Sequence, residues 1–103
     1  MTTPDRTVQL RRYVLEAGVL DEFLAWWHEL LVPARRAFDF TVEFGYALPE
    51  TNEFVWAVSL PGDRDHFLAV EADYIASPER AAAFGDRASW TTSQVISFAE
   101  PAI

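Results

Sequence analysis

The sequence contains no cysteine and no lysine, and it has only four glycines. Without cysteine there is no disulfide, no thiolate nucleophile and no zinc–thiolate site. Without lysine, no Schiff base and no covalently attached cofactor can form on an ammonium side chain. The glycines are scattered and the serines lack a G-x-S-x-G setting, so we expect neither a phosphate-binding loop nor a serine-hydrolase nucleophile.

Basic residues are also few, since eight arginines stand against 16 acidic residues and the net charge is −8. This balance disfavours a nucleic acid partner and an anionic membrane surface. No apolar run approaches the ~20 residues that span a bilayer, and residues 1–5 show no hydrophobic signal region. We therefore expect a single cytoplasmic domain covering residues 1–103.

Aromatic residues are abundant. Four tryptophans, eight phenylalanines and three tyrosines make up 15% of the chain. A large aromatic side chain buries roughly 150–250 Å², and a domain of this length has a thin core. The rings are therefore expected to fill the core, to line a pocket or to lie at a subunit interface.

Hydrophobic alternation predicts strands over residues 7–15, 41–48, 53–60 and 90–98. In the first, Gln9, Arg11 and Tyr13 share one face, and Val8, Leu10, Arg12 and Val14 share the other. In the second, Val42, Phe44, Tyr46 and Leu48 are expected on one face.

Helical periodicity predicts a long helix over residues 19–37, with Pro33 kinking it or ending a first segment near Leu31. Asp63 is the predicted N-cap of a second helix. Ser77 and Pro78 predict the start of a third, which ends near Gly85.

The order of elements is β-α-β-β-α-β, which is the ferredoxin-like arrangement of the α+β class. Its helices cover one face of the sheet and leave the other bare. A second copy packed sheet against sheet would cover that face. We therefore expect a twofold homodimer that forms a dimeric α+β barrel.

Three short motifs follow one another along this framework. Residues 9–23 contain QLRxYxLxxG and then LDEF before a tryptophan-bearing helix, residues 50–56 are ETNEFVW, and residues 74–79 are YIxSPE. In this order they resemble the NIPSNAP family over about residues 7–98, although that family usually has an acid at the position of Gln9. The resemblance implies the dimeric α+β barrel superfamily, whose members include cofactor-free monooxygenases of aromatic polyketides, polyketide cyclases, heme-binding proteins and proteins without an assigned activity.

His28 borders the apolar stripe of the long helix, where it could act as a general base or simply meet solvent. Arg11 and Tyr13 could donate hydrogen bonds to a developing enolate. Alternatively, Arg11 could pair with an acid such as Glu43. His66 lies too far from His28 in sequence for a metal pair, and no third ligand is evident, so we expect no metal and no cofactor.

Other side chains could form the walls of a ligand site, namely Trp27, Trp56, Tyr46, Phe67, Tyr74 and His66. Core packing is the default interpretation for Trp27 and Trp56, Tyr46 and Tyr74 suit a core equally well, and His66 could simply face solvent. Trp26 falls off the main helical stripe and is expected at an interface.

The leading hypothesis is a cofactor-independent cyclase, or cyclase and dehydratase, that acts on an aromatic polyketide-type intermediate in bacterial secondary metabolism. His28 would remove a proton, and Arg11 and Tyr13 would stabilise the enolate. The alternatives are a cofactor-free monooxygenase of a polyphenol and a dimeric binding module without catalysis.

Overall fold

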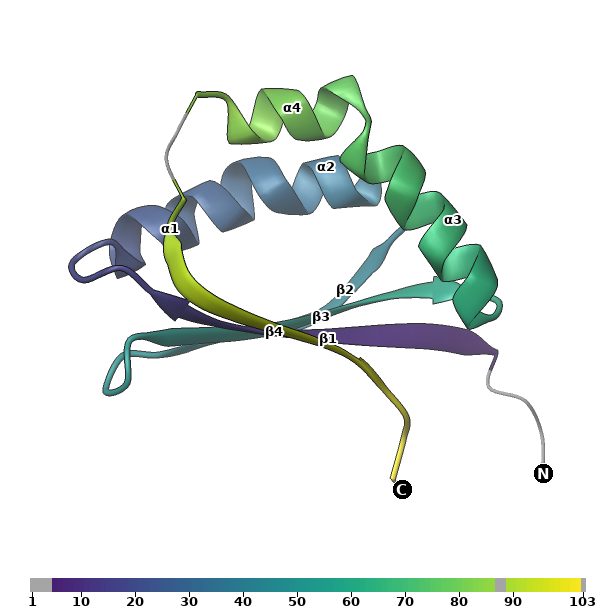
Figure 1. Cartoon of the computed structure of the whole chain (residues 1–103), viewed down its shortest axis with the longest axis horizontal. Coiled ribbons are helices and arrows are strands. Elements are labelled where there is room, and N and C mark those ends of the chain that lie inside the picture. The colour runs from purple at the N-terminus through teal and green to yellow at the C-terminus, as the bar shows by residue number, and fades with distance from the viewer. Residues whose placement is uncertain (1–4, 87–88, 103) are drawn as a thin grey trace.

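The computed structural model describes residues 5–86 and 89–102. Four strands and a layer of helices alternate along the chain (Figure 1). The elements in chain order are β1 (Arg6–Leu15), α1 (Leu20–Trp26), η1 (Trp27–Leu31), α2 (Val32–Arg36), β2 (Thr41–Leu48), β3 (Glu53–Pro61), α3 (Arg64–Ile75), α4 (Pro78–Phe84) and β4 (Thr91–Ala99).

The strands form one sheet in the order β2-β3-β1-β4, and each neighbouring pair is antiparallel. The helices lie over one face of this sheet (Figure 1). The predicted α+β class and ferredoxin-like topology are therefore confirmed. No helix in the described part of the chain is long and apolar enough to cross a membrane.

Local capping fixes the two later helices where the sequence predicts them. The Asp63 carboxylate accepts a hydrogen bond from the backbone N–H of His66 at 2.9 Å. The Ser77 hydroxyl accepts one from the backbone N–H of Arg80 at 3.1 Å, and Pro78 occupies the first helical position. These contacts satisfy amide groups that would otherwise lack partners at a helix start.

The long first helix is continuous through a π-helical turn, η1, which ends at Leu31, two residues before Pro33. The backbone N–H of Val32 donates to the carbonyl of Trp27, five residues earlier. This wider turn precedes Pro33, which has no backbone N–H to donate to the helical hydrogen-bond pattern. The predicted break near Leu31 is thus a change of helical pitch, and the helix runs on to Arg36.

The structure also corrects the expected position of Trp26. Its side chain is buried, and its indole N–H donates to the carbonyl of Ala83 at 2.7 Å. Because one turn of η1 holds more residues than a regular helical turn, Trp26 and Leu31 contribute to the same inner wall although they are five positions apart. The predicted stripe through Leu24, Trp27 and Leu31 leaves out Trp26, which lies three residues after the buried Phe23.

A bulge in β2 corrects a second expectation. The pairing of β2 with β3 shifts between Val42 and Phe44, so Val42 lies opposite Val58 on the helix-covered face. Phe44 and Tyr46 lie on the opposite, outer face. An extra residue reverses the alternation beyond it, which is why the four residues predicted to share a face are divided.

Gly45 lies beneath the indole of Trp27, and we predict that Gly45→Ala destabilises the fold by about 1–3 kcal/mol. A Cβ at this position would lie 2.6 Å from Cη2 of Trp27. Urea unfolding measures the loss. The double variant Gly45→Ala/Trp27→Leu should lose less stability than the sum of the two single variants, and strict additivity would contradict this explanation.

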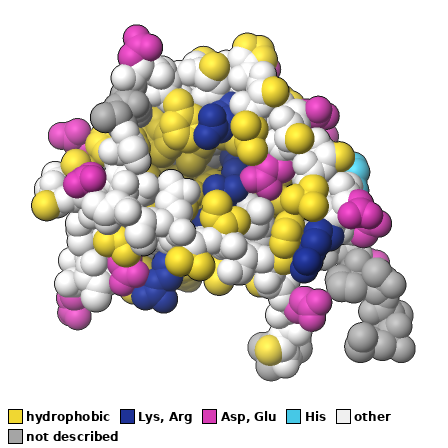
Figure 2. All heavy atoms as spheres, in the orientation of Figure 1, with side chains coloured by type: hydrophobic (Ala, Val, Ile, Leu, Met, Phe, Trp, Pro, Cys, Tyr) yellow, Lys and Arg dark blue, Asp and Glu magenta, His cyan; other side chains and the backbone are white. Residues whose placement is uncertain are grey.

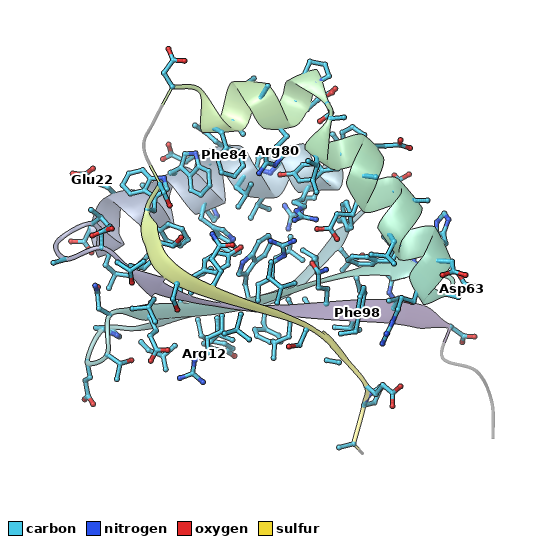
Figure 3. All side chains as sticks on the ribbon, viewed as in Figure 1. Arg12, Glu22, Asp63, Arg80, Phe84 and Phe98 are labelled. Atoms are coloured by element: carbon cyan, nitrogen blue, oxygen red, sulfur yellow. The ribbon has the colours of Figure 1, made fainter. Side chains whose placement is uncertain are left out.

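The outer face of the sheet, opposite the helices, carries a row of apolar side chains. By strand register these are Val8, Leu10, Val14, Phe44, Tyr46, Val55 and Val95. The face also carries an ion pair between Arg12 and Glu53. Arg12 bonds Glu53 at 2.8 Å, and Arg12 points away from the helices in Figure 3. The polar row of Gln9, Arg11 and Tyr13 faces the helices instead.

Candidate functional site

A cavity of about 270 Å³ lies between the helices and the end of the sheet near the start of β4. Its walls are mainly aromatic, and its polar side chains come from β4, from Ser89 two residues before β4, and from Tyr13. The lining residues are Tyr13, Phe23, Trp26, Leu31, Phe84, Ser89, Trp90, Thr91 and Gln94. Phe84 points from α4 toward the sheet in Figure 3. A flat, largely apolar molecule suits such walls.

Tyr13 connects this cavity to a group of charged side chains. Its ring packs edge-on against Phe23, with 6.2 Å between the ring centroids. Its hydroxyl accepts a hydrogen bond from Nη1 of Arg11 at 3.3 Å. Tyr13 therefore lines the cavity while its hydroxyl is hydrogen-bonded to Arg11.

Arg11 is held by two further partners. Its Nη2 lies 2.5 Å from Oε1 of Glu71, and its Nε donates to the side-chain oxygen of Gln9 at 2.8 Å. The Gln9 amide in turn donates to Oε2 of Glu71 at 3.1 Å. We call Gln9, Arg11, Arg35 and Glu71 the charge cluster. Within it, both oxygens of the single carboxylate are already engaged.

Arg35 is the second cation of the charge cluster and is only 3% exposed. Its Nη2 lies 3.6 Å from Oε1 of Glu71, which is an ion pair without a hydrogen bond. Its guanidinium stacks on the rings of Tyr74 at 4.3 Å and Phe40 at 4.8 Å. Burial, followed by repulsion from Arg11, lowers the pKa of Arg35 to about 10.

Arg35 and two aromatic residues that it contacts have buried hydrogen-bond donors without a partner among the described residues. These donors are Nε and Nη1 of Arg35, the indole N–H of Trp56 and the hydroxyl of Tyr74. Burial raises the pKa of the Tyr74 phenol, whereas Arg35, Arg80 and Arg11 act to lower it. This neighbourhood is rich in donors and in positive charge.

The cavity and the charge cluster adjoin along two elements. Arg35 lies one turn beyond Leu31 on the long helix, and Arg11 lies two residues before Tyr13 on the same face of β1. The long helix runs antiparallel to β1 (Figure 1). The step from Leu31 to Arg35 on the helix and the step from Tyr13 to Arg11 on β1 therefore lead in the same direction, away from the cavity. Figure 2 shows the hollow between the helices and β4, with hydrophobic side chains inside it and arginine and acidic side chains alongside.

The structure brings some of the predicted site residues together and separates others. Tyr13 and Arg11 meet at the cavity and the charge cluster. Trp56 and Tyr74 are buried beside the cluster, and Phe67 is buried in the core. Trp27 packs on Phe54 and Trp56 and does not line the cavity.

Three of the predicted site residues lie outside this region. His28 is exposed on η1, His66 is exposed on the first turn of α3, and Tyr46 is 68% exposed on the outer face of the sheet. None of the three lines the cavity. Within the described part of the chain, no three His, Cys, Asp or Glu side chains come together as a metal site would require.

Arg11 pairs with Glu71 of α3, which corrects the alternative that it pairs with Glu43. The Glu43 carboxylate instead accepts a hydrogen bond from the Ser59 hydroxyl at 2.9 Å. Ser59 belongs to the outer face of the sheet by register, whereas Arg11 faces the helices. The two side chains are therefore on opposite sides of the sheet.

Sequence reasoning missed Glu71 and Arg35, although each leaves a signal in its helix. Glu71 lies four residues after Phe67 and three before Tyr74, and Arg35 lies four residues after Leu31. These are positions of the buried stripe. A charge at a stripe position on two separate helices indicates a buried ionic group, which β1 completes with Arg11.

Similar solved structures show the same architecture over nearly the whole chain. A NIPSNAP domain protein from Burkholderia xenovorans superposes with a TM-score of 0.79 at 20% identity, covering 93% of this chain and 94% of its own. A NIPSNAP family protein from Agrobacterium tumefaciens gives 0.81 at 11% identity, covering 93% and 92%. The chain has the NIPSNAP fold.

The NIPSNAP resemblance seen in the motifs is thus confirmed for the fold. A protein from Bacteroides thetaiotaomicron described as a candidate antibiotic biosynthesis monooxygenase also superposes, with a TM-score of 0.69 at 20% identity and coverage of 96% and 91%. No family model matches the sequence, and no curated protein is significantly similar to it. Since one fold supports many chemistries, function has to be argued from the site.

Proposed function

We propose that the protein is a cofactor-independent cyclase that acts on an aromatic polyketide-type intermediate. One observation carries the proposal, namely that an aromatic-walled cavity of about 270 Å³ contains the Tyr13 phenol, with Arg11 bonded behind it at 3.3 Å. The rings suit a planar or folded ketone chain. The phenol and guanidinium suit a ketone oxygen that becomes an enolate oxygen.

The reaction needs no redox partner. A carbon between two ketones loses a proton, and the resulting enolate carbon attacks a second ketone of the same chain, forming a carbon–carbon bond and an alkoxide. The alkoxide takes up a proton, and the aldol product loses water to give a conjugated ring. Holding the reacting carbons in contact supplies much of the rate gain.

Tyr13 supplies the hydrogen bond to the enolate oxygen, and Arg11 keeps the phenol polarised. No carboxylate or imidazole is among the described lining residues, and His28 is exposed on η1. In this proposal solvent water takes the first proton, and the site acts by stabilising the enolate. This differs from the sequence hypothesis, in which His28 was the base.

Removal of the Tyr13 hydroxyl tests this role. We predict that Tyr13→Phe lowers the turnover of a poly-β-ketone by about 10²–10³-fold, because one donor to the enolate is lost. Mass spectrometry of the product should show loss of one water. Tyr46→Phe removes the same group from the exposed outer face and should leave turnover unchanged. Full activity of Tyr13→Phe would contradict the proposal.

A second candidate function is cofactor-free monooxygenation, which is favoured by the structural similarity to the candidate monooxygenase from Bacteroides thetaiotaomicron. There, an electron-rich phenolic substrate reduces dioxygen, one oxygen atom enters the product and the other leaves as water. A product that gains an oxygen supports this function over the cyclase. Ligand binding without turnover in either assay supports a non-catalytic binding module.

We further propose that two copies pair through their outer sheet faces. The face is apolar and its Arg12 is paired with Glu53, so two copies can meet without leaving that charge unpartnered. Sedimentation should show a dimer, and Val95→Glu should shift it to a monomer. Val95 is 59% exposed in the subunit, so the variant leaves the fold intact. A monomeric wild type would overturn the proposal.

A further inference from the structure

Arg35 takes no part in the proposed enolate chemistry, yet it is a buried cation with open donors. Its Nε and Nη1 have no partner among the described residues. Its remaining nitrogen, Nη2, is 3.6 Å from Glu71, whose oxygens already serve Arg11 and Gln9. Two arginines thus share one carboxylate, and one positive charge in the charge cluster is uncompensated. Burial of such a charge is unfavourable unless something negative accompanies it.

The residues stacked on Arg35 add further donors and no free acceptor charge. Its Cζ lies 4.3 Å from the ring centroid of Tyr74 and 5.6 Å from that of Trp56. The Tyr74 hydroxyl and the Trp56 indole N–H are buried without partners among the described residues. A place with several open donors and an excess of positive charge selects an anion.

This donor-rich place adjoins the cavity and is not a separate surface site. Leu31 lines the cavity and Arg35 follows it by one helical turn, while Tyr13 lines the cavity and bonds Arg11. Arginine and acidic side chains lie at the edge of the hydrophobic hollow in Figure 2. Tyr13 and Leu31 line the cavity next to the charge cluster, whereas Arg35 and Tyr74 do not line it themselves.

We infer that the ligand of the cavity is an anion, whose carboxylate or enolate oxygen is held by Arg35 and Tyr74 while its apolar body lies between the rings. This inference rests on the proposed function only in taking the cavity as the ligand site. It narrows the substrate class to acidic ketones and phenols, such as a polyketone chain that ends in a free carboxylate. A neutral ester or amide of the same shape is discriminated against.

Calorimetric titration of the full chain with three probes tests the charge requirement. We expect 2-naphthoate to bind about tenfold to a hundredfold more tightly than neutral 2-naphthamide, because a charged hydrogen-bonded group is lost. Acetate, which has the charge but no rings, should bind far more weakly than 2-naphthoate. Equal affinity for 2-naphthoate and 2-naphthamide would overturn the inference, and so would acetate binding as tightly as 2-naphthoate.

Matched variants locate the anion. Arg35→Met should abolish the preference for 2-naphthoate over 2-naphthamide, and Tyr74→Phe, which keeps the ring, should reduce it. Arg36→Met removes the same charge from the neighbouring exposed position and should retain the full preference. A preference that survives in both Arg35→Met and Tyr74→Phe would refute the assignment.

The test also separates this inference from the proposed function. An Arg35-dependent preference for 2-naphthoate, without turnover of any poly-β-ketone, would leave the anion site standing and remove the cyclase. Turnover of a poly-β-ketone with no preference for 2-naphthoate would support the cyclase and remove the anion site.

Discussion

Glu71→Gln is expected to lower the free energy of unfolding by about 3–5 kcal/mol. The carboxylate of Glu71 is the one acceptor that both Arg11 and Arg35 approach, and it also accepts from Gln9. The amide of glutamine has no charge, and its NH₂ group would face donors. Two buried arginines would then repel each other without a counter-charge. Urea unfolding followed by tryptophan fluorescence measures the loss.

The control for this prediction is Glu79→Gln, which makes the same change at an exposed position in the first turn of α4. Its effect should stay within about 1 kcal/mol, because charges near a helix terminus contribute little when solvated. A loss for Glu71→Gln no larger than that of the control would show that the charge cluster does not stabilise the fold.

Arg35→Met is expected to have the opposite sign and to raise the free energy of unfolding by about 1–3 kcal/mol. It removes the uncompensated charge and leaves Arg11 and Glu71 as a neutral pair. Burial lowers the pKa of Arg35 from its usual value to about 10, which corresponds to roughly 3 kcal/mol of unfavourable charge burial. Loss of the stack on Tyr74 and Phe40 offsets part of the gain.

The sign of the pH dependence follows from the same pKa. Above about pH 10 the unfolded chain still holds the Arg35 proton that the folded chain has begun to lose, so stability rises with pH there. Below about pH 10 Arg35 is protonated in both states, and its penalty is constant. The gain from Arg35→Met should therefore be equal at about pH 6 and about pH 9.

Arg36→Met is the matched control, since Arg36 is the next residue and is exposed. It should change stability by less than about 1 kcal/mol. A stability loss for Arg35→Met would show that the guanidinium is already compensated in the free protein. That result would also weaken the case for an anionic ligand.

The alternation of apolar residues determined the strands, and the order of elements determined the topology. Both signals are local and repeat along the chain, and the caps at Asp63 and Ser77 fix helix starts with contacts three residues away. Interactions of such short range are visible in sequence. The predicted row of Gln9, Arg11 and Tyr13 on one strand face belongs to the same class of signal.

Only the tertiary structure decided which partners this row meets. Glu71 is 60 residues from Arg11 in sequence, and their contact depends on how α3 crosses the sheet. That Leu31 shares one wall with Trp26 depends on the π turn, and the positions of Phe44 and Tyr46 depend on the bulge in β2. The π turn adds part of a turn to the helix, and the bulge adds one residue to the strand. Side chains after either irregularity therefore lie on a different face from the one that regular periodicity predicts. Periodicity in sequence cannot register such an insertion, whereas packing of the helices on the sheet determines it.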